Sequence, residues 1–177
     1  MATLIALLRG INIGGHHKLQ MKALTAALEE LGLREVRTYL QSGNVVFRSN
    51  TKDRTALAVK ITAAITAQHN FAPQVLLLDT EALHEAMANN PYPEAEATPA
   101  YLSLLFLAET PSHPDLKALE ALRANSERFK LVGKVFYLHA PDGFGRSKLA
   151  ANAERLLGVP ATGRNWNTVR KLAEMTA

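Results

Sequence analysis

The sequence contains no cysteine, and it is poor in aromatic residues and in long apolar runs. Without cysteine the chain has no disulfide, no thiolate nucleophile and no cysteine-ligated zinc. This composition suits the reducing cytoplasm, where we expect the protein. The apolar run Leu4–Leu8 is too short to cross a membrane, and no basic segment precedes it. We therefore expect a buried strand there, no targeting segment and no membrane partner.

The composition is that of an ordinary folded protein. The chain has 177 residues, of which 47% are hydrophobic and 20% are charged. That length is sufficient for a packed core without disulfides, in one domain or in two small ones. The net charge of +4 favours anionic partners, although a solvated surface that leans positive explains the same charge.

The clearest local signal is a hairpin near the middle of the first half. Two β-rich runs, Val36–Leu40 and Val45–Phe47, flank the polar residues Ser42, Gly43 and Asn44. Glycine and asparagine tolerate the positive φ that tight hairpin turns demand. The stretch therefore predicts two antiparallel strands and a short turn.

Around this hairpin the first half of the chain predicts the order β-α-β-β-α-β. Strands are expected at residues 3–9 and 74–78, and apolar spacing predicts a helix from Met21 that ends near Gly32. A second helix is expected to begin at the N-cap Thr51. This order is that of a ferredoxin-like unit.

The same order repeats in the second half. A helix from Thr80 leads to residues 91–99, which contain three prolines and are expected to form an irregular linker. The repeat then runs from residue 101 to 165, with one helix beginning at Ser112, and a terminal helix starts at Trp166. The predicted fold class is α+β, with two consecutive ferredoxin-like βαββαβ units and a C-terminal helix. The expected divisions are 1–80 for the first unit, 81–100 for the connecting helix and linker, and 101–177 for the second unit with the terminal helix.

Strand directions predict where the polar loops lie. In a ferredoxin-like unit the loop after the first strand and the turn of the hairpin reach the same edge of the sheet. The loop Gly10–Lys18 should therefore lie beside the turn Gln41–Asn44. If the connecting helix makes a single traverse, the loop Ala140–Arg146 and the segment Thr162–Asn165 arrive at that edge too.

The side chains of these four segments suit the binding of an anion. Cationic and neutral hydrogen-bonding groups dominate, and Asp142 is the only carboxylate among them. Glycine lets backbone N–H groups approach a ligand, a helix N-terminus favours anions, and arginine forms paired hydrogen bonds with phosphate or carboxylate. The predicted ligand-binding residues are Arg9, Asn12, Lys18, Ser42, Asn44, Arg146, Ser147, Arg164 and Asn165.

Structural roles explain several of these features equally well. The run Gly10–Gly15 matches neither the dinucleotide fingerprint nor a P-loop, and its glycines suit a strand-to-helix turn. Ser147 suits a helix cap as well as a ligand contact, and Trp166 suits the core. Neighbouring His16 and His17 have no evident third ligand, so no metal site is predicted. Neither a catalytic triad nor a pair of carboxylates for acid–base chemistry is evident, and no particular cofactor is indicated.

Three motifs together resemble one bacterial protein family. They are Leu7–Gly15 (LLRGINIGG), Thr38–Phe47 (TYLQSGNVVF) and Arg164–Val169 (RNWNTV), and they span nearly the whole chain. In this order they resemble the family called domain of unknown function 1697. The resemblance implies a soluble, mostly bacterial α+β protein, and it implies no activity and no catalytic residues.

Three functions stay open on the sequence. The first is a site for a phosphorylated metabolite or nucleotide; in an enzyme, Arg9, Arg146 or Arg164 would stabilise a developing anion. The second is a nucleic-acid-binding module, because ferredoxin-like sheets bind RNA by stacking bases on exposed aromatic residues. The third is a protein-interaction domain without a ligand. The chemistry of the polar segments favours the first, and the sequence decides neither enzymatic activity nor oligomeric state.

Overall fold

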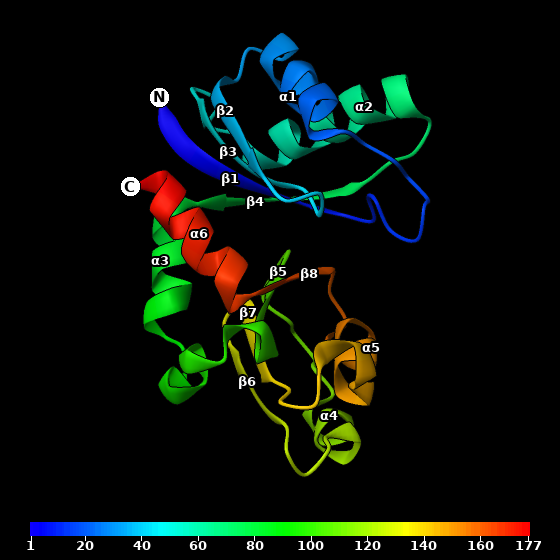
Figure 1. The fold of residues 1–177 in the computed structure, drawn as a ribbon, viewed down its shortest axis with the longest axis vertical. Helices are drawn as coiled ribbons and strands as arrows, with labels where there is room; N and C mark the ends of the chain where they lie inside the picture. The colour runs from blue at the N-terminus through cyan, green and yellow to red at the C-terminus, as the bar shows by residue number, and fades with distance from the viewer. The chain divides into compact units, whose positions relative to one another are not determined.

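The computed structural model describes residues 1–177, and the chain divides into two compact units (Figure 1). Unit 1 comprises Met1–His84 and Leu172–Ala177, and unit 2 comprises Glu85–Lys171. Each unit holds a four-stranded antiparallel sheet with two helices in the order βαββαβ. The predicted α+β fold of two ferredoxin-like units with a C-terminal helix is confirmed.

The sheet of unit 1 has the strand order β2-β3-β1-β4, so the first strand lies in its interior. Its strands are β1 (Ala2–Arg9), β2 (Arg34–Tyr39), β3 (Asn44–Ser49) and β4 (Gln74–Asp79). Its helices are α1 (Met21–Glu30) and α2 (Arg54–His69). The register pairs Leu7 with Asn44 and Arg9 with Gln74, which brings the end of β1 to the beginnings of β3 and β4.

The core of unit 1 lies between this sheet and its two helices. Leu4, Ala6 and Leu8 share one face of β1, because successive side chains of a strand alternate in direction. Residues spaced by four along the helices pack against them, namely Leu24 and Leu28 of α1 and Leu57, Ile61 and Ile65 of α2. Each fully buried leucine or isoleucine contributes about 1.5–3 kcal/mol relative to an exposed one.

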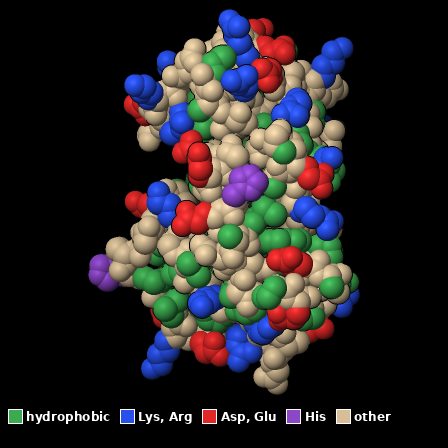
Figure 2. All heavy atoms as spheres, turned by 90° about the vertical axis from the view of Figure 1, so that its left-hand side faces the viewer, with side chains coloured by type: hydrophobic (Ala, Val, Ile, Leu, Met, Phe, Trp, Pro, Cys, Tyr) green, Lys and Arg blue, Asp and Glu red, His purple; other side chains and the backbone are tan.

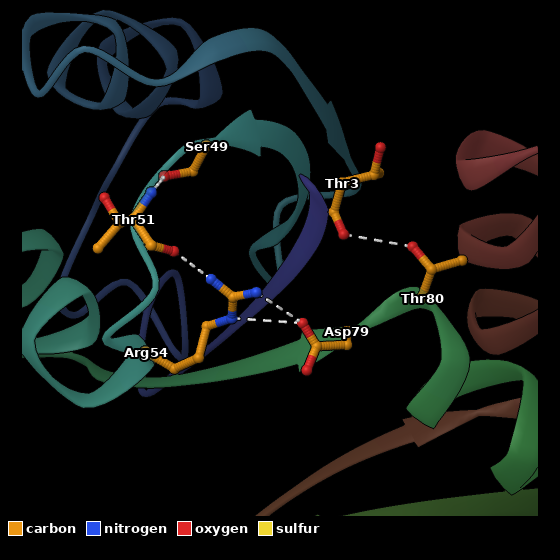
Figure 3. Close-up of polar contacts among 6 residues, drawn as sticks. All are labelled: Thr3, Ser49, Thr51, Arg54, Asp79 and Thr80. Atoms are coloured by element: carbon orange, nitrogen blue, oxygen red, sulfur yellow. Dashed lines mark hydrogen bonds and ion pairs between the residues drawn. The ribbon is translucent and has the colours of Figure 1, made fainter. Parts of the chain in front are cut away.

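Polar contacts stabilise the end of the unit 1 sheet where β1 begins and β4 ends (Figure 3). The Arg54 guanidinium donates to Asp79 at 3.0 Å and also to the carbonyl of Thr51, and the Thr80 hydroxyl donates to the carbonyl of Thr3 at 3.3 Å. An exposed ion pair of this kind contributes only about 0.2–1 kcal/mol. The Arg54 guanidinium therefore makes its hydrogen bonds to groups within the protein.

The sheet of unit 2 repeats the arrangement with the order β6-β7-β5-β8. Its strands are β5 (Leu102–Leu107), β6 (Arg128–Val132), β7 (Val135–His139) and β8 (Ala161–Asn165). Its helices are α4 (Leu116–Leu122) and α5 (Lys148–Leu157), with the short 3₁₀ helix η3 (Phe144–Arg146) before α5. Its core combines Leu105 and Leu107 with Leu119, Leu149 and Leu157.

Two further helices accompany the units. The chain leaves β4 through α3 (Thr80–Ala88), and α6 (Trp166–Thr176) follows β8. The last six residues belong to unit 1, where the Arg37 guanidinium donates to the carbonyl of Met175 at 2.5 Å. The Tyr137 hydroxyl of β7 donates to the carbonyl of Ala86 at 2.5 Å, which ties the end of α3 into unit 2.

Two predicted helix starts are wrong, and so is the prediction that the proline-rich segment is irregular. The cap of α2 is Asp53, not Thr51, because its carboxylate accepts the N–H of Ala56 at 2.9 Å. The cap of α4 is likewise Asp115, not Ser112. The proline-rich segment is not irregular, since it forms the 3₁₀ helices η1 (Pro93–Ala97) and η2 (Pro99–Tyr101), each with proline in its first turn, where the fixed φ of proline is compatible with a helix.

None of the helices combines the length and the apolar character that crossing a membrane requires.

Candidate functional site

Five predicted site residues of unit 1 gather at one end of its sheet. The loop between β1 and α1 and the turn between β2 and β3 meet there, and together they are called the loop end of unit 1. The Gly43 carbonyl of the turn accepts the Leu8 N–H at 2.8 Å. Asn12 of the loop donates to the Gln41 carbonyl of the turn at 2.7 Å. The predicted residues at this end are Arg9, Asn12, Lys18, Ser42 and Asn44.

Asn12 acts as a brace for the loop rather than as an exposed ligand group. Its Nδ2 donates to the carbonyls of Leu19 and Gln41, and its Oδ1 accepts the Leu19 N–H at 2.8 Å. Both amide hydrogens are therefore used within the protein. The side chain holds the two ends of the loop together and attaches them to the turn.

Asn44 has a similar role in the hairpin. Its side chain is buried, and its Nδ2 donates to the Tyr39 carbonyl at 2.7 Å and to the Ser42 hydroxyl at 3.0 Å. These bonds close the turn across its own backbone, which is the ordinary function of asparagine in turns. A buried amide held in this way stabilises the shape of the loop end.

The loop end contains an unusual concentration of left-handed backbone. Among its non-glycine residues, Asn12, His17 and Leu40 have φ values of 52°, 52° and 59°. Such conformations cost on the order of 1 kcal/mol or more each for an L residue and persist only where the surroundings impose them. For His17 the surroundings are a 2.9 Å hydrogen bond to the Gly10 carbonyl and a stacked contact with the Phe71 ring, with ring centroids 4.6 Å apart.

Arg9 and Lys18 supply the positive charge of this end. Both side chains are exposed, and Arg9 donates weakly to the Gln74 amide at 3.5 Å. The rigid loop end therefore presents cationic side chains on a backbone whose conformation is fixed from within.

The predicted residues of unit 2 also share one end of their sheet. The register pairs Leu102 with His139 and Ser103 with Asn165, so β7 and β8 finish at the same end. The loop that follows β7 folds back toward β8, where the Phe144 ring lies 3.9 Å from the position a Cβ of Gly163 would occupy.

The two residues at the end of β8 differ in role. Asn165 caps α6, because its Oδ1 accepts the Thr168 N–H at 3.1 Å. The Arg164 guanidinium donates to the Gly163 carbonyl at 2.9 Å. Burial lowers the pKa of Arg164 to about 10, so it still carries its charge at neutral pH.

A pocket of about 450 Å³ opens in unit 2 beside the start of α5. It is called the α5 pocket here. Its lining comes from the end of α4, from the turn that follows α4 and from the loop that enters α5. Its lining residues are Ala121, Leu122, Ala124, Glu127, Asp142, Gly143, Arg146, Ser147 and Lys148.

The α5 pocket contains two cations and the beginning of a helix. Arg146 and Lys148 are exposed and take part in no ion pair or side-chain hydrogen bond. Ser147 between them caps α5, since its hydroxyl accepts the Ala150 N–H at 3.0 Å. A helix N-terminus carries a partial positive charge, which adds to that of the two side chains. This part of the pocket attracts anions.

Two carboxylates line the same pocket. Glu127 is 4% exposed and its Oε1 accepts the Ala124 N–H at 2.8 Å, while Asp142 accepts the Ser126 hydroxyl at 2.6 Å. Asp142 is the carboxylate that the sequence places among the polar loops, whereas Glu127 was not predicted. Nothing in the sequence distinguishes Glu127, because it reaches the pocket through a turn that only the folded chain forms.

The predicted ligand-binding residues thus fall into two sets. One set lies at the loop end of unit 1, and the other lies at one end of the sheet of unit 2. Asn12, Asn44, Ser147 and Asn165 hold loops or cap helices, whereas the cations Arg9, Lys18 and Arg146 face solvent. That both sets serve a single ligand stays a prediction. No group of three or more histidine, aspartate or glutamate side chains is placed to hold a metal ion.

Fold and site together define a protein of two ferredoxin-like units with polar, glycine-containing loop ends. The chain belongs to the family described as protein of unknown function DUF1697, whose model matches residues 1–137. It is similar in structure to the conserved bacterial protein SP0830 from Streptococcus pneumoniae, with a TM-score of 0.73, 26% sequence identity and coverage of 99% of each chain. No match was found among curated proteins.

Proposed function

We propose that the protein binds a small, phosphate-bearing anion in the α5 pocket. The observation that carries the proposal is the pair Arg146 and Lys148, which line a pocket without engaging any carboxylate of the chain. Because neither cation is paired with a protein carboxylate, both remain available to a bound anion. The pocket volume of about 450 Å³ is within the range of about 300–1,000 Å³ typical of small-molecule sites.

The chemistry of the pocket fits a phosphate group better than a single point charge. Arginine can donate two parallel hydrogen bonds to phosphate, and lysine adds a flexible ammonium group. The start of α5 supplies backbone N–H groups, which bind phosphate oxygens at helix N-termini. Gly143, with a φ of 104°, lets the entering loop turn sharply beside them.

Arg9, Lys18, Ser42 and Arg164 are proposed as further contacts to the same class of ligand. The exposed cations and rigid backbone of the loop end of unit 1 support this part of the proposal. Replacing Arg9 by Gln and measuring phosphate binding tests the proposed contacts of unit 1 separately from those of the α5 pocket.

A nucleic-acid-binding function has less support. Phe47, Phe106 and Phe136 of the two sheets are 0%, 2% and 0% exposed, so these rings cannot stack on bases. On the face drawn in Figure 2, Lys and Arg side chains are interspersed with Asp and Glu side chains over each unit and form no continuous basic surface. A ligand smaller than a nucleic acid agrees better with both observations.

The proposal is tested by titrating inorganic phosphate and pyrophosphate while following the melting temperature. A ligand that binds only the folded state must raise it. We expect the increase to be lost in Arg146→Gln and in Lys148→Gln. Lys134→Gln is the matched control, because Lys134 is an exposed cation at the β6–β7 turn, at the other end of the same sheet. No increase in the wild type, or an equal increase in all variants, would contradict the proposal.

The absence of cysteine also supports a proposed location in the reducing cytoplasm of a bacterium. The similarity to a streptococcal protein supports the bacterial origin.

A further inference from the structure

We infer that the ligand of the α5 pocket is a hydroxyl-bearing phosphate ester of the sugar-phosphate type. The inference rests on the proposed function and goes beyond it, because it names the part of the ligand next to the phosphate. The observation behind it is that Glu127 and Asp142 line the same pocket as Arg146 and Lys148. A site for phosphate alone gains nothing from two carboxylates, since they repel the anion.

Glu127 is held in place through one of its two carboxylate oxygens. Its side chain is 4% exposed, and its Oε1 accepts the Ala124 N–H at 2.8 Å. The Arg123 guanidinium donates to the Glu127 carbonyl at 2.8 Å, which fixes the backbone of the turn. Its Oε2 accepts no hydrogen bond from the protein, so a ligand hydroxyl in the pocket can donate to it.

Asp142 already shows how a hydroxyl binds at this place. Its Oδ2 accepts the hydroxyl of Ser126 at 2.6 Å, a short distance typical of a hydroxyl donating to a charged oxygen. This bond joins the turn that carries Glu127 to the loop that carries Arg146, and Oδ1 has no partner in the protein. A carboxylate accepts up to about four hydrogen bonds, so a ligand hydroxyl can bind beside Ser126.

The remaining wall of the pocket is apolar and small. It consists of Ala121, Leu122 and Ala124, which suit the carbon skeleton of a compact ligand. The pocket thus provides cations for a phosphate, acceptors for hydroxyl hydrogens, and a small apolar surface on α4 and the turn that follows it. A phosphorylated sugar carries these three kinds of group in one molecule.

The test compares three probes on the full chain by calorimetric titration in the presence of EDTA. Ribose 5-phosphate carries both groups, ethyl phosphate carries only the phosphate, and ribose carries only the hydroxyls. We expect ribose 5-phosphate to bind at least about 10-fold more tightly than ethyl phosphate, the effect of about one hydrogen bond to a charged group. Ribose is expected to bind most weakly.

Removing a carboxylate should weaken the binding of ribose 5-phosphate but not the binding of ethyl phosphate. In Asp142→Asn, and in Glu127→Gln if it folds, ribose 5-phosphate should bind about 10-fold more weakly, because the charged acceptor is lost. Ethyl phosphate should bind equally or more tightly, because a repelling charge is gone. Glu109→Gln is the matched control, an exposed carboxylate that follows β5 and does not line the pocket.

The outcomes separate this inference from the proposed function. If both esters bind equally, or if both gain affinity in Asp142→Asn, the hydroxyl assignment is wrong while anion binding stands. If ribose 5-phosphate binds only after Mg²⁺ replaces EDTA, the carboxylates hold a cation instead and the inference is overturned. If neither ester binds the wild type, the proposed function itself fails.

Discussion

Gly43 lies so close to Leu8 that a Cβ on Gly43 would be 2.7 Å from the Leu8 Cβ. The same addition would be 2.8 Å from Cδ1 of Ile11. The Gly43 carbonyl also accepts the Leu8 N–H, and the Gly43 φ is 89°. Backbone conformation and space both require glycine at this position, where the turn meets the first strand and its loop.

Replacing Gly43 by Ala should therefore lower the free energy of unfolding by about 2–4 kcal/mol, combining left-handed strain with displacement of buried side chains. Gly32→Ala is the matched control, because Gly32 has a φ of 82° but no atom within 4 Å of an added Cβ. We expect it to cost only about 1–2 kcal/mol. Urea unfolding of both variants measures the difference, and equal losses would show that the close contact is relieved cheaply.

Replacing Asn12 by Ala should free the loop between β1 and α1. The variant loses the hydrogen bonds to Leu19 and Gln41 and places alanine at a φ of 52°. We expect the free energy of unfolding to fall by about 1–2 kcal/mol, since the partly buried backbone groups of Leu19 lose their bonds. Limited proteolysis should cut near Gly14 and Gly15 faster than in the wild type, and an unchanged cleavage rate would contradict the bracing role.

Replacing Tyr137 by Phe removes the bond to the Ala86 carbonyl and leaves that acceptor unsatisfied. The free energy of unfolding should fall by about 1–2 kcal/mol, whereas Tyr101→Phe, at an exposed position, should change little. Burial raises the pKa of Tyr137 to about 12. In a spectroscopic pH titration, the Phe variant should therefore lack the tyrosine that ionises last. Loss of an earlier-ionising tyrosine would contradict this assignment.

His139 should make unit 2 less stable in mild acid. Burial, followed by the nearby Arg128 charge, lowers the pKa of His139, while Glu94 opposes the shift. Arg128 donates to the His139 Nδ1 at 3.1 Å and pairs with Glu94, so the ring accepts at Nδ1 and is neutral. Below the ordinary histidine pKa of 6.5, the unfolded chain takes up a proton more readily than the folded one.

The free energy of unfolding should therefore decrease as the pH falls below about 6.5. His139→Gln should flatten the decrease in the free energy of unfolding that begins below pH 6.5, because glutamine does not titrate. Hydrogen bonds, first from its own backbone and then from Arg128, lower the pKa of Glu94. Its contribution to the free energy of unfolding is therefore lost only at more acidic pH, below the ordinary carboxyl pKa of 4.5. If the free energy of unfolding of His139→Gln depended on pH as steeply as that of the wild type, another group would cause the acid destabilisation.

Much of the fold could be predicted from sequence because its signals are local. The β-branched and aromatic residues of Val45–Phe47, apolar spacing in α1 and glycine in the hairpin turn each specify an element within a few residues. The order of these elements then indicated the ferredoxin-like topology, since few connections join strands and helices in that order. The exact first residues of the helices could not be predicted in the same way. Asp53 and Asp115 compete with Thr51 and Ser112 as caps, and only the backbone conformation decides between them.

The candidate site was harder to predict because side-chain roles depend on partners distant in sequence. Asn12 and Asn44 have the residue type of ligand contacts, yet their amides are used inside the loop end of unit 1. Glu127 gave no sequence signal, yet it lines the α5 pocket together with Arg146 and Lys148.

The sequence by itself determined the order of elements in the two repeated units and the hairpin, because local propensity and periodicity act over short stretches of chain. The tertiary structure alone decided which polar groups are used in bracing and which face a pocket. A hydrogen-bonding side chain is committed by whichever donor or acceptor folding brings within about 3 Å. Those partners come from strands, turns and helices that are neighbours only after the sheets have formed.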